Sequence, residues 1–375
     1  MKIALVACGL EHIQRGFESF TRELFDNYKE ADTEVHLYKG SGRRVGNEIV
    51  ITPLRRSSVL LKLLKPTSKG IYYRYKIECF TFAFMMLPHL IKHKYDLILF
   101  SDNELGKALL ILRRVFKLRF KILFSNGAPW HAGECKIYDG VQEVTKAFQE
   151  KNIADGVDRN RSWFVPYGIA VSNYNFSHLN KEALKQHFNI PAGATVVLSL
   201  SALKFSHKRL DWLIKEYARL KGNYFLIMAG GEDEETPGVK KLAEQQLKAG
   251  SYSFMTVPYS EVVKLLAICD VMVSTSLSEA FGRVLLEATV AKVPVLAHPH
   301  YAAKEIIAHP SSYVNMENEG ELAGMMAAIN NDAALRNEMI ERNFTYSTGH
   351  FDWSNLNQQY TAMYKGVLKS TVNEG

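Results

Sequence analysis

Residues 271–288 read VMVSTSLSEAFGRVLLEA, and this stretch decides the fold. The apolar run at 271–275 predicts a short buried strand, and the apolar positions between Glu279 and Glu287 predict a helix. A strand that leads into a helix start offers N–H groups and the positive end of the helix dipole to phosphate. The two carboxylates can accept hydrogen bonds from sugar hydroxyls. The stretch therefore indicates a site for a hydroxyl-rich ligand that carries phosphate.

A simpler interpretation of the same residues is a solvated helix surface. Arg283 and Glu287 are four residues apart and can form a helix ion pair worth about 0.2–0.5 kcal/mol. Glu279 can be an ordinary carboxylate at a helix amino terminus. The ligand interpretation is favoured because the motif follows a predicted buried strand.

Length and composition indicate a globular chain of two domains. The 375 residues are 47% hydrophobic and 23% charged, which is ordinary for globular proteins, and a single core rarely grows to this length. The cysteines are scattered without a CxxC pair, which argues against a disulfide framework or a structural zinc site and fits a reducing cytosol. They are Cys8, Cys79, Cys135 and Cys269.

The apolar segments are too short for a signal peptide or a membrane span. Residues 1–9 are apolar but run directly into Glu11 and Arg15, so they predict a first buried strand. The longest other apolar run, 79–88, is well below the roughly 20 residues that cross a bilayer. We expect a cytoplasmic protein, either soluble or peripheral at the cytoplasmic face of a membrane.

Positive charge gathers in the first half of the chain. Residues 1–165 hold 27 Lys and Arg against 18 Asp and Glu, a net charge of +9. The excess is concentrated between positions 39 and 121, where 18 basic residues face 5 acidic ones. Such a surface attracts an acidic lipid surface or a phosphorylated acceptor, although it can also be solvated without any partner. We expect no nucleic-acid partner, because no nucleic-acid-binding module accompanies the charge.

Short apolar runs alternate with amphipathic segments along both halves. This pattern predicts parallel sheets covered by helices on both faces, and therefore an α/β chain of two Rossmann-like domains with the active site in the cleft between them. The predicted strands are 3–7, 33–38, 96–101, 121–125, 195–202, 224–229, 254–257, 271–275 and 294–297. The predicted helices are 16–28, 73–86, 104–116, 210–220, 239–249 and 260–267.

A turn at 163–169 (WFVPYGI) marks the predicted domain boundary. We expect domains at 1–165 and 166–350. The tail 351–375 has apolar residues at helical spacing and is expected to pack back toward the first domain.

On the basis of these residues, the chain resembles retaining glycosyltransferases of the GT-B fold, family 4. The resemblance covers the second half well and the first half loosely. Its most specific part is EAFGRVLLE at 279–287 together with HKRLDWLI at 207–214. Weaker parts are VPYGI at 165–169, MAGGE at 228–232, RGFE at 15–18 and the strand approach that contains Asp270.

The resemblance implies a role for each motif residue. Glu279 is expected to hold donor-sugar hydroxyls, Glu287 the nucleotide ribose, and Lys208 the diphosphate. The backbone N–H groups expected to face the diphosphate are those of Phe281, Gly282 and Arg283. The glycines counted with the donor site are Gly16, in the amino-terminal loop, and Gly230. The first domain is expected to bind the acceptor and the second the nucleotide sugar.

The chemistry accounts for these residue types. Cleavage of a sugar–diphosphate bond develops negative charge on the leaving phosphate, which a cation and aimed N–H dipoles stabilise. The sugar passes through an oxocarbenium-like state, as in glycoside hydrolysis. No D-x-D metal motif is present, so we expect metal-independent catalysis with no cofactor and a UDP- or GDP-linked donor. The acidic run 232–235 is interpreted as a solvated loop.

The chain departs from the family pattern at three places. The Arg that usually partners the lysine is replaced by Ala202, and Lys204 or Arg209 is expected to substitute for it. Tyr167 stands where VPNG has Asn. A first-domain His near the acceptor is replaced by Asn126, and His131 follows five residues later; it is either a base or hydrogen-bond donor, or merely structural. The candidate catalytic residues are therefore Glu279, Lys208, His131 and Asn126.

We expect a retaining hexosyltransferase that moves a hexose-type sugar from a nucleotide diphosphate to a hydroxyl of a glycolipid or polysaccharide precursor. Two alternatives stay open. One is a related GT-B enzyme such as a nucleotide-sugar epimerase. The other is a nucleotide-sugar-binding protein without turnover, because of Ala202 and Tyr167.

Overall fold

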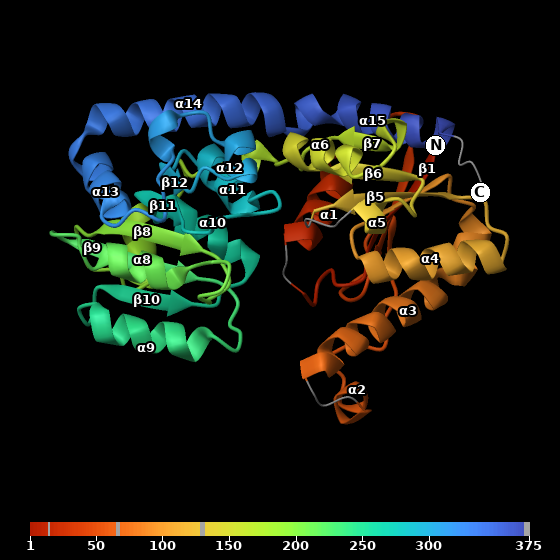
Figure 1. The fold of residues 1–375 in the computed structure, drawn as a ribbon, viewed down its shortest axis with the longest axis horizontal. Coiled ribbons are helices and arrows are strands. Elements are labelled where there is room, and N and C mark those ends of the chain that lie inside the picture. Colours follow the sequence, from red (N-terminus) through yellow and green to blue (C-terminus); the bar gives the residue numbers. More distant parts are fainter. Residues whose placement is uncertain (14–15, 65–67, 128–131, 371–375) are drawn as a thin grey trace. The chain divides into compact units, whose positions relative to one another are not determined.

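The computed structural model describes residues 1–13, 16–64, 68–127 and 132–370. The chain divides into two compact units (Figure 1). Unit 1 consists of Met1–Gly168 together with the chain from Trp353 onward, and unit 2 is Ile169–Asp352. His131 and its neighbours 128–130 lie outside the described residues. Among the described residues, no helix is long and apolar enough to cross a bilayer.

Unit 1 is built on a seven-stranded sheet in the order β3-β2-β1-β4-β5-β6-β7, in which every paired strand is parallel. The strands are β1 (Lys2–Ala7), β2 (Glu34–Lys39), β3 (Glu48–Val50), β4 (Leu97–Phe100), β5 (Lys121–Asn126), β6 (Gly140–Glu143) and β7 (Ser162–Phe164). The helices are α1 (Gly16–Asn27), α2 (Val59–Leu64), α3 (Ser68–His93), α4 (Asn103–Val115), α5 (Ala132–Cys135), α6 (Lys146–Ala154) and α15 (Trp353–Lys369).

Alternation along the strands of unit 1 divides its apolar residues between the two faces of the sheet. Ala4, Val6 and Ile98 share one core cluster with Phe82 and Met86 of α3. Figure 1 shows α3 and α4 along this side of the sheet and α15 along the other. Helix α3 therefore has one side buried in the core of unit 1.

Unit 2 is built on a five-stranded parallel sheet in the order β10-β9-β8-β11-β12. The strands are β8 (Thr195–Leu200), β9 (Tyr224–Ala229), β10 (Tyr252–Met255), β11 (Val271–Ser274) and β12 (Val295–Ala297). The helices are α7 (Lys181–His187), α8 (Leu210–Tyr217), α9 (Thr236–Gln246), α10 (Tyr259–Ile268), α11 (Arg283–Val290), α12 (Tyr301–Ile306), α13 (Glu321–Asn331) and α14 (Ala333–Phe351).

The two sheets have the same topology. In each, the first strand is central, the next two extend to one side, and the chain then returns to build the other side. This is the doubly wound order, and its reversal falls between β1 and β4 in unit 1 and between β8 and β11 in unit 2. The predicted fold class of two Rossmann-like domains is confirmed.

The carboxyl-terminal helix α15 belongs to unit 1. It starts at Trp353, whose ring lies against Gly168: a Cβ at this glycine would lie 2.6 Å from the ring. Farther along, the Tyr360 hydroxyl donates to the Pro166 carbonyl at 2.8 Å and accepts from Gln142 Nε2 at 2.9 Å. The chain thus leaves unit 1 after residue 168 and returns to it at residue 353.

Two buried tyrosines of α15 provide a matched test of this packing. Tyr360→Phe should lower the free energy of unfolding by about 1–3 kcal/mol, because it removes the donor to the Pro166 carbonyl and one of the two acceptors of the buried Gln142 amide. Tyr364→Phe should cost far less, because the buried Tyr364 hydroxyl has no hydrogen-bond partner among the described residues. Urea titration of both variants measures the difference. Equal losses would contradict the account of α15.

Candidate functional site

A lysine and a glutamate meet at the reversal point of unit 2. Lys208 lies in the loop between β8 and α8, and Glu279 lies in the loop between β11 and α11. Because β8 and β11 are parallel neighbours, their following loops meet at the carboxyl edge of the sheet. There the Lys208 ammonium donates to Glu279 Oε1. Their side chains are 18% and 16% exposed, so both are within reach of a ligand.

The backbone around Lys208 is held in an unusual conformation. His207 and Arg209, on either side of it, have φ angles of 67° and 51°. Left-handed backbone costs a non-glycine residue on the order of 1–3 kcal/mol and persists only where its surroundings fix it. The Thr275 hydroxyl, at the end of β11, donates to the Lys208 carbonyl at 2.7 Å and so ties this loop to the neighbouring strand.

A second carboxylate fixes the same loop from the other side. Glu235 Oε2 accepts from the N–H groups of Phe205 and Ser206, both at 2.8 Å. Glu235 comes from the acidic run 232–235, so this residue of the run has a structural use. The loop that carries Lys208 is therefore held by both β11 and the segment before α9.

Glu279 is ionised at neutral pH. Burial acts to raise its pKa, but the Lys208 ammonium, the Ser276 hydrogen bond and nearby His207 outweigh burial, and the pKa lies below its usual value. His207 Nε2 lies 3.9 Å from the second oxygen of the carboxylate. An ionised carboxylate accepts hydrogen bonds and cannot donate them, so Glu279 suits the recognition of hydroxyl groups.

Helix α11 begins beside Glu279. Its N-cap is Gly282, with φ at 80°, a region that glycine enters without steric cost. Gly282 has no side chain with which to cap the helix start. Phe281 is 3% exposed and packs its ring edge-on against Phe351 at 6.0 Å. The Phe281 side chain thus anchors the turn from which α11 starts.

Arg283 and Glu287 form the i, i+4 pair that the simpler interpretation of the sequence expects. Arg283 Nη2 lies 3.4 Å from Glu287 Oε1. The pair is buried, at 7% and 3% exposure, and is not a solvated surface pair. The ribose-binding role of Glu287 stays a prediction.

Lys204 and Arg209, the two candidates for a second cation beside Lys208, differ in the contacts that their side chains make. Arg209 Nη1 donates to the Met316 carbonyl at 2.7 Å, and its guanidinium stacks on Trp212 at 4.9 Å. Lys204 is half-buried and forms no ion pair among the residues described. Burial and the charge of Lys208 lower the pKa of nearby His207, and the charge of Lys204 adds a smaller effect in the same direction. Lys204 is therefore the better candidate to assist Lys208.

His300 lies close enough to Glu279 for the carboxylate charge to act on its pKa. It is 7% exposed, and burial lowers its pKa to about 4, against the opposing charge of Glu279, so it is neutral at physiological pH. Its Nδ1 accepts from the Ala303 N–H and caps α12. No group of three or more His, Cys, Asp or Glu side chains in the described chain could hold a metal.

Asn126 ends β5 in unit 1 and points to a buried acid. Its Nδ2 donates to Glu143 Oε2 at 2.9 Å, and Asn152 donates to Glu143 Oε1 at 2.7 Å. Both Asn126 and Glu143 are almost fully buried. This environment is that of a core network; whether Asn126 also acts in catalysis stays a prediction. Sequence reasoning missed Glu143, because β6, the strand that contains it, was not among the predicted strands.

A second buried charge cluster of unit 1 was also missed. Glu78 of α3 is fully buried and pairs with His12, 3.0 Å away in the loop after β1, and with Arg56. Gly16 starts α1 just beyond that loop. Glu78 is the only acid between Glu48 and Asp96, and this was the available signal in the sequence.

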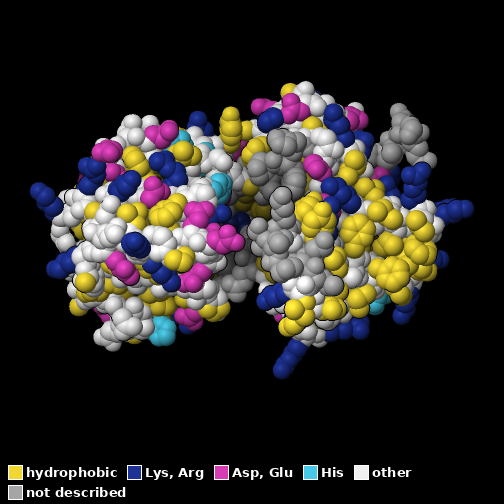
Figure 2. Space-filling model, turned by 60° about the horizontal axis from the view of Figure 1, so that its bottom comes forward, with side chains coloured by type: hydrophobic (Ala, Val, Ile, Leu, Met, Phe, Trp, Pro, Cys, Tyr) yellow, Lys and Arg dark blue, Asp and Glu magenta, His cyan; other side chains and the backbone are white. Residues whose placement is uncertain are grey.

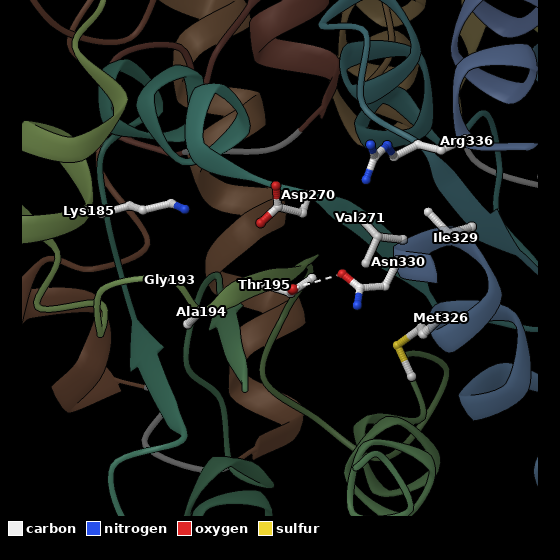
Figure 3. Close-up of a pocket in the computed structure, with 10 residues that line it drawn as sticks. All are labelled: Lys185, Gly193, Ala194, Thr195, Asp270, Val271, Met326, Ile329, Asn330 and Arg336. Carbon is white, nitrogen blue, oxygen red and sulfur yellow. Dashed lines mark hydrogen bonds between the residues drawn. The ribbon is translucent and has the colours of Figure 1, made fainter. Parts of the chain in front are cut away.

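A hollow of about 230 Å³ lies at the opposite edge of the unit 2 sheet (Figure 3). Thr195 and Val271, the first residues of β8 and β11, line it together with Asp270. Figure 3 shows the hydrogen bond that Thr195 donates to Asn330. Lys185 and Arg336 lie at the margins of the hollow. Because it lies at the amino ends of the strands, it is separate from the Lys208–Glu279 site.

Residues 180–345, all within unit 2, match the family model Glycosyl transferases group 1. They include Lys208, Glu279 and Glu287. A curated relative is the lipopolysaccharide core biosynthesis glycosyltransferase LpsE of Rhizobium meliloti, 28% identical over 193 residues. This match covers 51% of the chain and spans 55% of the length of LpsE.

Solved structures with the same fold match nearly the whole chain. Anabaena HepE, in complex with UDP-glucose, is 18% identical with a TM-score of 0.77, and the match covers 97% of this chain and 99% of HepE. Sucrose-phosphate synthase from Thermosynechococcus elongatus is 16% identical with a TM-score of 0.75, over 99% and 100% of the two chains. These likenesses show the GT-B fold.

The two glycines after β9, Gly230 and Gly231, should respond differently to substitution by alanine. A Cβ at Gly230 would lie 1.8 Å from the Ser201 carbonyl oxygen, whereas nothing lies within 4 Å of one at Gly231. Gly230→Ala should therefore lower stability by about 1–3 kcal/mol, the scale of overpacking. Gly231→Ala should be neutral or slightly stabilising. Thermal unfolding of both variants distinguishes them, and a tolerated Gly230→Ala would contradict the close approach of the two loops.

Glu143 should make stability depend on pH. Burial, opposed by its two amide partners, raises its pKa to about 7 from an ordinary value of 4.5. The folded chain therefore keeps a proton that the unfolded chain releases, so the contribution is complete below pH 4.5 and is lost as the pH rises through 7.

Glu143→Gln should remove this dependence. Relative to the parent, the variant should gain up to about 3 kcal/mol between pH 4.5 and 8, from 1.36 kcal/mol per pKa unit. Unfolding titrations across this range measure the gain. Exposed Glu150→Gln, on adjacent α6, is the control, and parallel pH profiles for all three proteins would refute the assignment.

Proposed function

We propose that this chain is a glycosyltransferase that uses a nucleotide-diphosphate sugar, with its donor site on unit 2. The observation that carries the proposal is the pairing of Lys208 with ionised Glu279 at the reversal point of the sheet. The match of residues 180–345 to Glycosyl transferases group 1 supports it. So does the fold shared with HepE, whose structure contains UDP-glucose. We propose a hexose-type donor linked to UDP or GDP.

In the proposed site, the donor replaces the ion pair between Lys208 and Glu279, and each side chain then binds a part of the donor. The diphosphate competes for the Lys208 ammonium, with Lys204 as the second cation. The start of α11 provides N–H groups and a positive dipole end to the same phosphates. Glu279 then accepts from the sugar hydroxyls. Fixing the Lys208 loop in advance lowers the reorganisation needed when negative charge develops on the leaving diphosphate.

We propose retention of configuration and no metal requirement, as in family 4 of this fold. Lys208, Lys204 and the helix dipole would supply the positive charge that a metal ion supplies elsewhere. A reaction run with and without a chelator tests the second part. Analysis of the product anomer by NMR tests the first.

We propose that the acceptor is a hydroxyl of a glycolipid or polysaccharide precursor bound by unit 1. The net charge of +9 on residues 1–165 favours an anionic acceptor or an acidic surface. The named role of LpsE in lipopolysaccharide core biosynthesis supports an acceptor of this class.

A binding protein without turnover is the second candidate. Ala202 replaces the expected arginine, and the Tyr167 ring stacks on Phe20 at 3.9 Å inside unit 1. The Tyr167 ring is therefore packed within unit 1, and its hydroxyl lies 3.3 Å from the Ser125 hydroxyl. Slow hydrolysis of the donor separates the two candidates, because an active transferase releases some sugar to water and a pure binder releases none.

The donor is identified by thermal shift with UDP, GDP, ADP and their hexose conjugates. Binding stabilises the fold by RT ln(1 + [L]/Kd), about 2.7 kcal/mol at 100 times Kd, so the true donor produces the largest shift. Absence of a shift with every nucleotide and every sugar conjugate would overturn the proposal.

Removal of Lys208 tests the diphosphate assignment. Lys208→Ala should weaken donor binding by about 1.5–3 kcal/mol, the scale of a hydrogen bond to a charged group. Glu279→Ala should abolish transfer. Lys215→Ala, on the exposed side of α8, is the control and should leave affinity unchanged. Calorimetric titration measures affinity, and near-normal turnover by folded Glu279→Ala would exclude its assigned role.

A further inference from the structure

An exposed apolar stripe runs along α3 of unit 1. Tyr73, Phe80, Phe84 and Ile91 are 53%, 41%, 64% and 51% exposed. At about 100° per residue, their spacing places all four within roughly 40° of one another around the helix. The stripe is therefore continuous along most of α3.

The stripe is not the core side of the helix. The core side contains Cys79, Phe82, Ala83, Met86 and Leu90, all buried in the cluster under the sheet. Helix α3 is thus apolar on two sides, and packing within unit 1 accounts for only one of them. A contiguous exposed apolar surface of this kind marks an interaction site.

The neighbouring helices enlarge the surface. Val59, Leu60 and Leu63 of α2 are 72%, 56% and 75% exposed. Ile111 and Val115 of α4 are 51% and 65% exposed, and α4 packs along α3. Figure 2 shows hydrophobic side chains gathered over much of the near face of unit 1, with Lys and Arg at its margins. We call this surface, formed by α2, α3 and α4, the apolar face.

The exposed charges of the apolar face are of one sign. The two acids on these helices, Glu78 and Glu104, are 0% and 4% exposed, and both are paired with cations. Exposed cations remain on the same helices or directly after α4. They are Lys62, Lys92, Arg114, Lys117 and Arg119. The described parts of the three helices therefore present apolar groups and positive charge without an exposed carboxylate.

We propose that the apolar face docks unit 1 on an anionic lipid bilayer. Amphipathic helices bind at the headgroup–acyl boundary through apolar side chains, and Lys and Arg add attraction to anionic headgroups. Because the core side of α3 is buried, the helix lies along the surface and inserts only its exposed stripe. The charge pattern favours lipid over a protein partner, since every exposed ionic side chain described on the three helices is a cation that matches lipid phosphate.

This inference deepens the proposed function and rests on it for its biological meaning. An enzyme held at a bilayer is brought to hydroxyl acceptors carried on lipid. The docking itself does not depend on turnover, so the two can fail separately.

Vesicle sedimentation of the full chain tests the docking. We expect binding to vesicles of phosphatidylcholine with 30% phosphatidylglycerol, and at least tenfold weaker binding to phosphatidylcholine alone or in 0.5 M NaCl. The double variant Phe84→Ser/Ile91→Ser should bind at least tenfold more weakly. Tyr301→Ser, which replaces an equally exposed ring in unit 2, is the control and should bind like the parent.

The outcomes separate docking from catalysis. The double variant should keep its unfolding temperature and the thermal shift produced by the donor, because both side chains are exposed and belong to unit 1. No binding to anionic vesicles at low salt overturns the docking, as does equal binding by the double variant. A dimer in solution that the double variant abolishes also overturns it, because the face would then cover a second copy.

Discussion

The Lys208–Glu279 ion pair is the contact on which the rest of the account depends. It joins the loops that follow two neighbouring strands, β8 and β11, at the point where the strand order reverses. The pair is mostly buried, so loss of one partner leaves the other charge poorly solvated. The Thr275 hydroxyl and the Glu235 carboxylate hold the loop around Lys208, including its left-handed residues His207 and Arg209, in place. The same polar contact therefore joins two loops of the fold and positions the proposed donor-binding side chains.

The environments around this pair set its chemistry. Lys208 keeps Glu279 ionised, burial keeps His300 neutral, and Arg209 is occupied by a carbonyl and an indole ring. The site thus contains one accepting carboxylate and two lysines, which are the groups that the proposed nucleotide-sugar donor requires. In unit 1 the buried acids Glu78 and Glu143 are instead satisfied within the fold.

Secondary structure that depends on the local pattern of apolar residues could be predicted from the sequence. The strands of unit 2 were recognisable because their apolar runs are short and separated by helical periods; 224–229 matches β9 at both ends. Strands β3 and β6 were missed, since β3 has three residues and β6 places Gln142 and Glu143 in the core. Long-range contacts, such as Lys208 with Glu279, depend on strand order, which spacing along the chain does not contain. The outward stripe of α3 was also hidden, because both of its sides are apolar.

A crystal structure of the chain with the nucleotide sugar chosen by thermal shift tests the central claim most directly. The account predicts phosphate oxygens within hydrogen-bonding distance of Lys208 Nζ and the backbone N–H groups at 281–283, with Glu279 turned to a sugar hydroxyl. A diphosphate bound elsewhere, with Lys208 and Glu279 still paired, would contradict it.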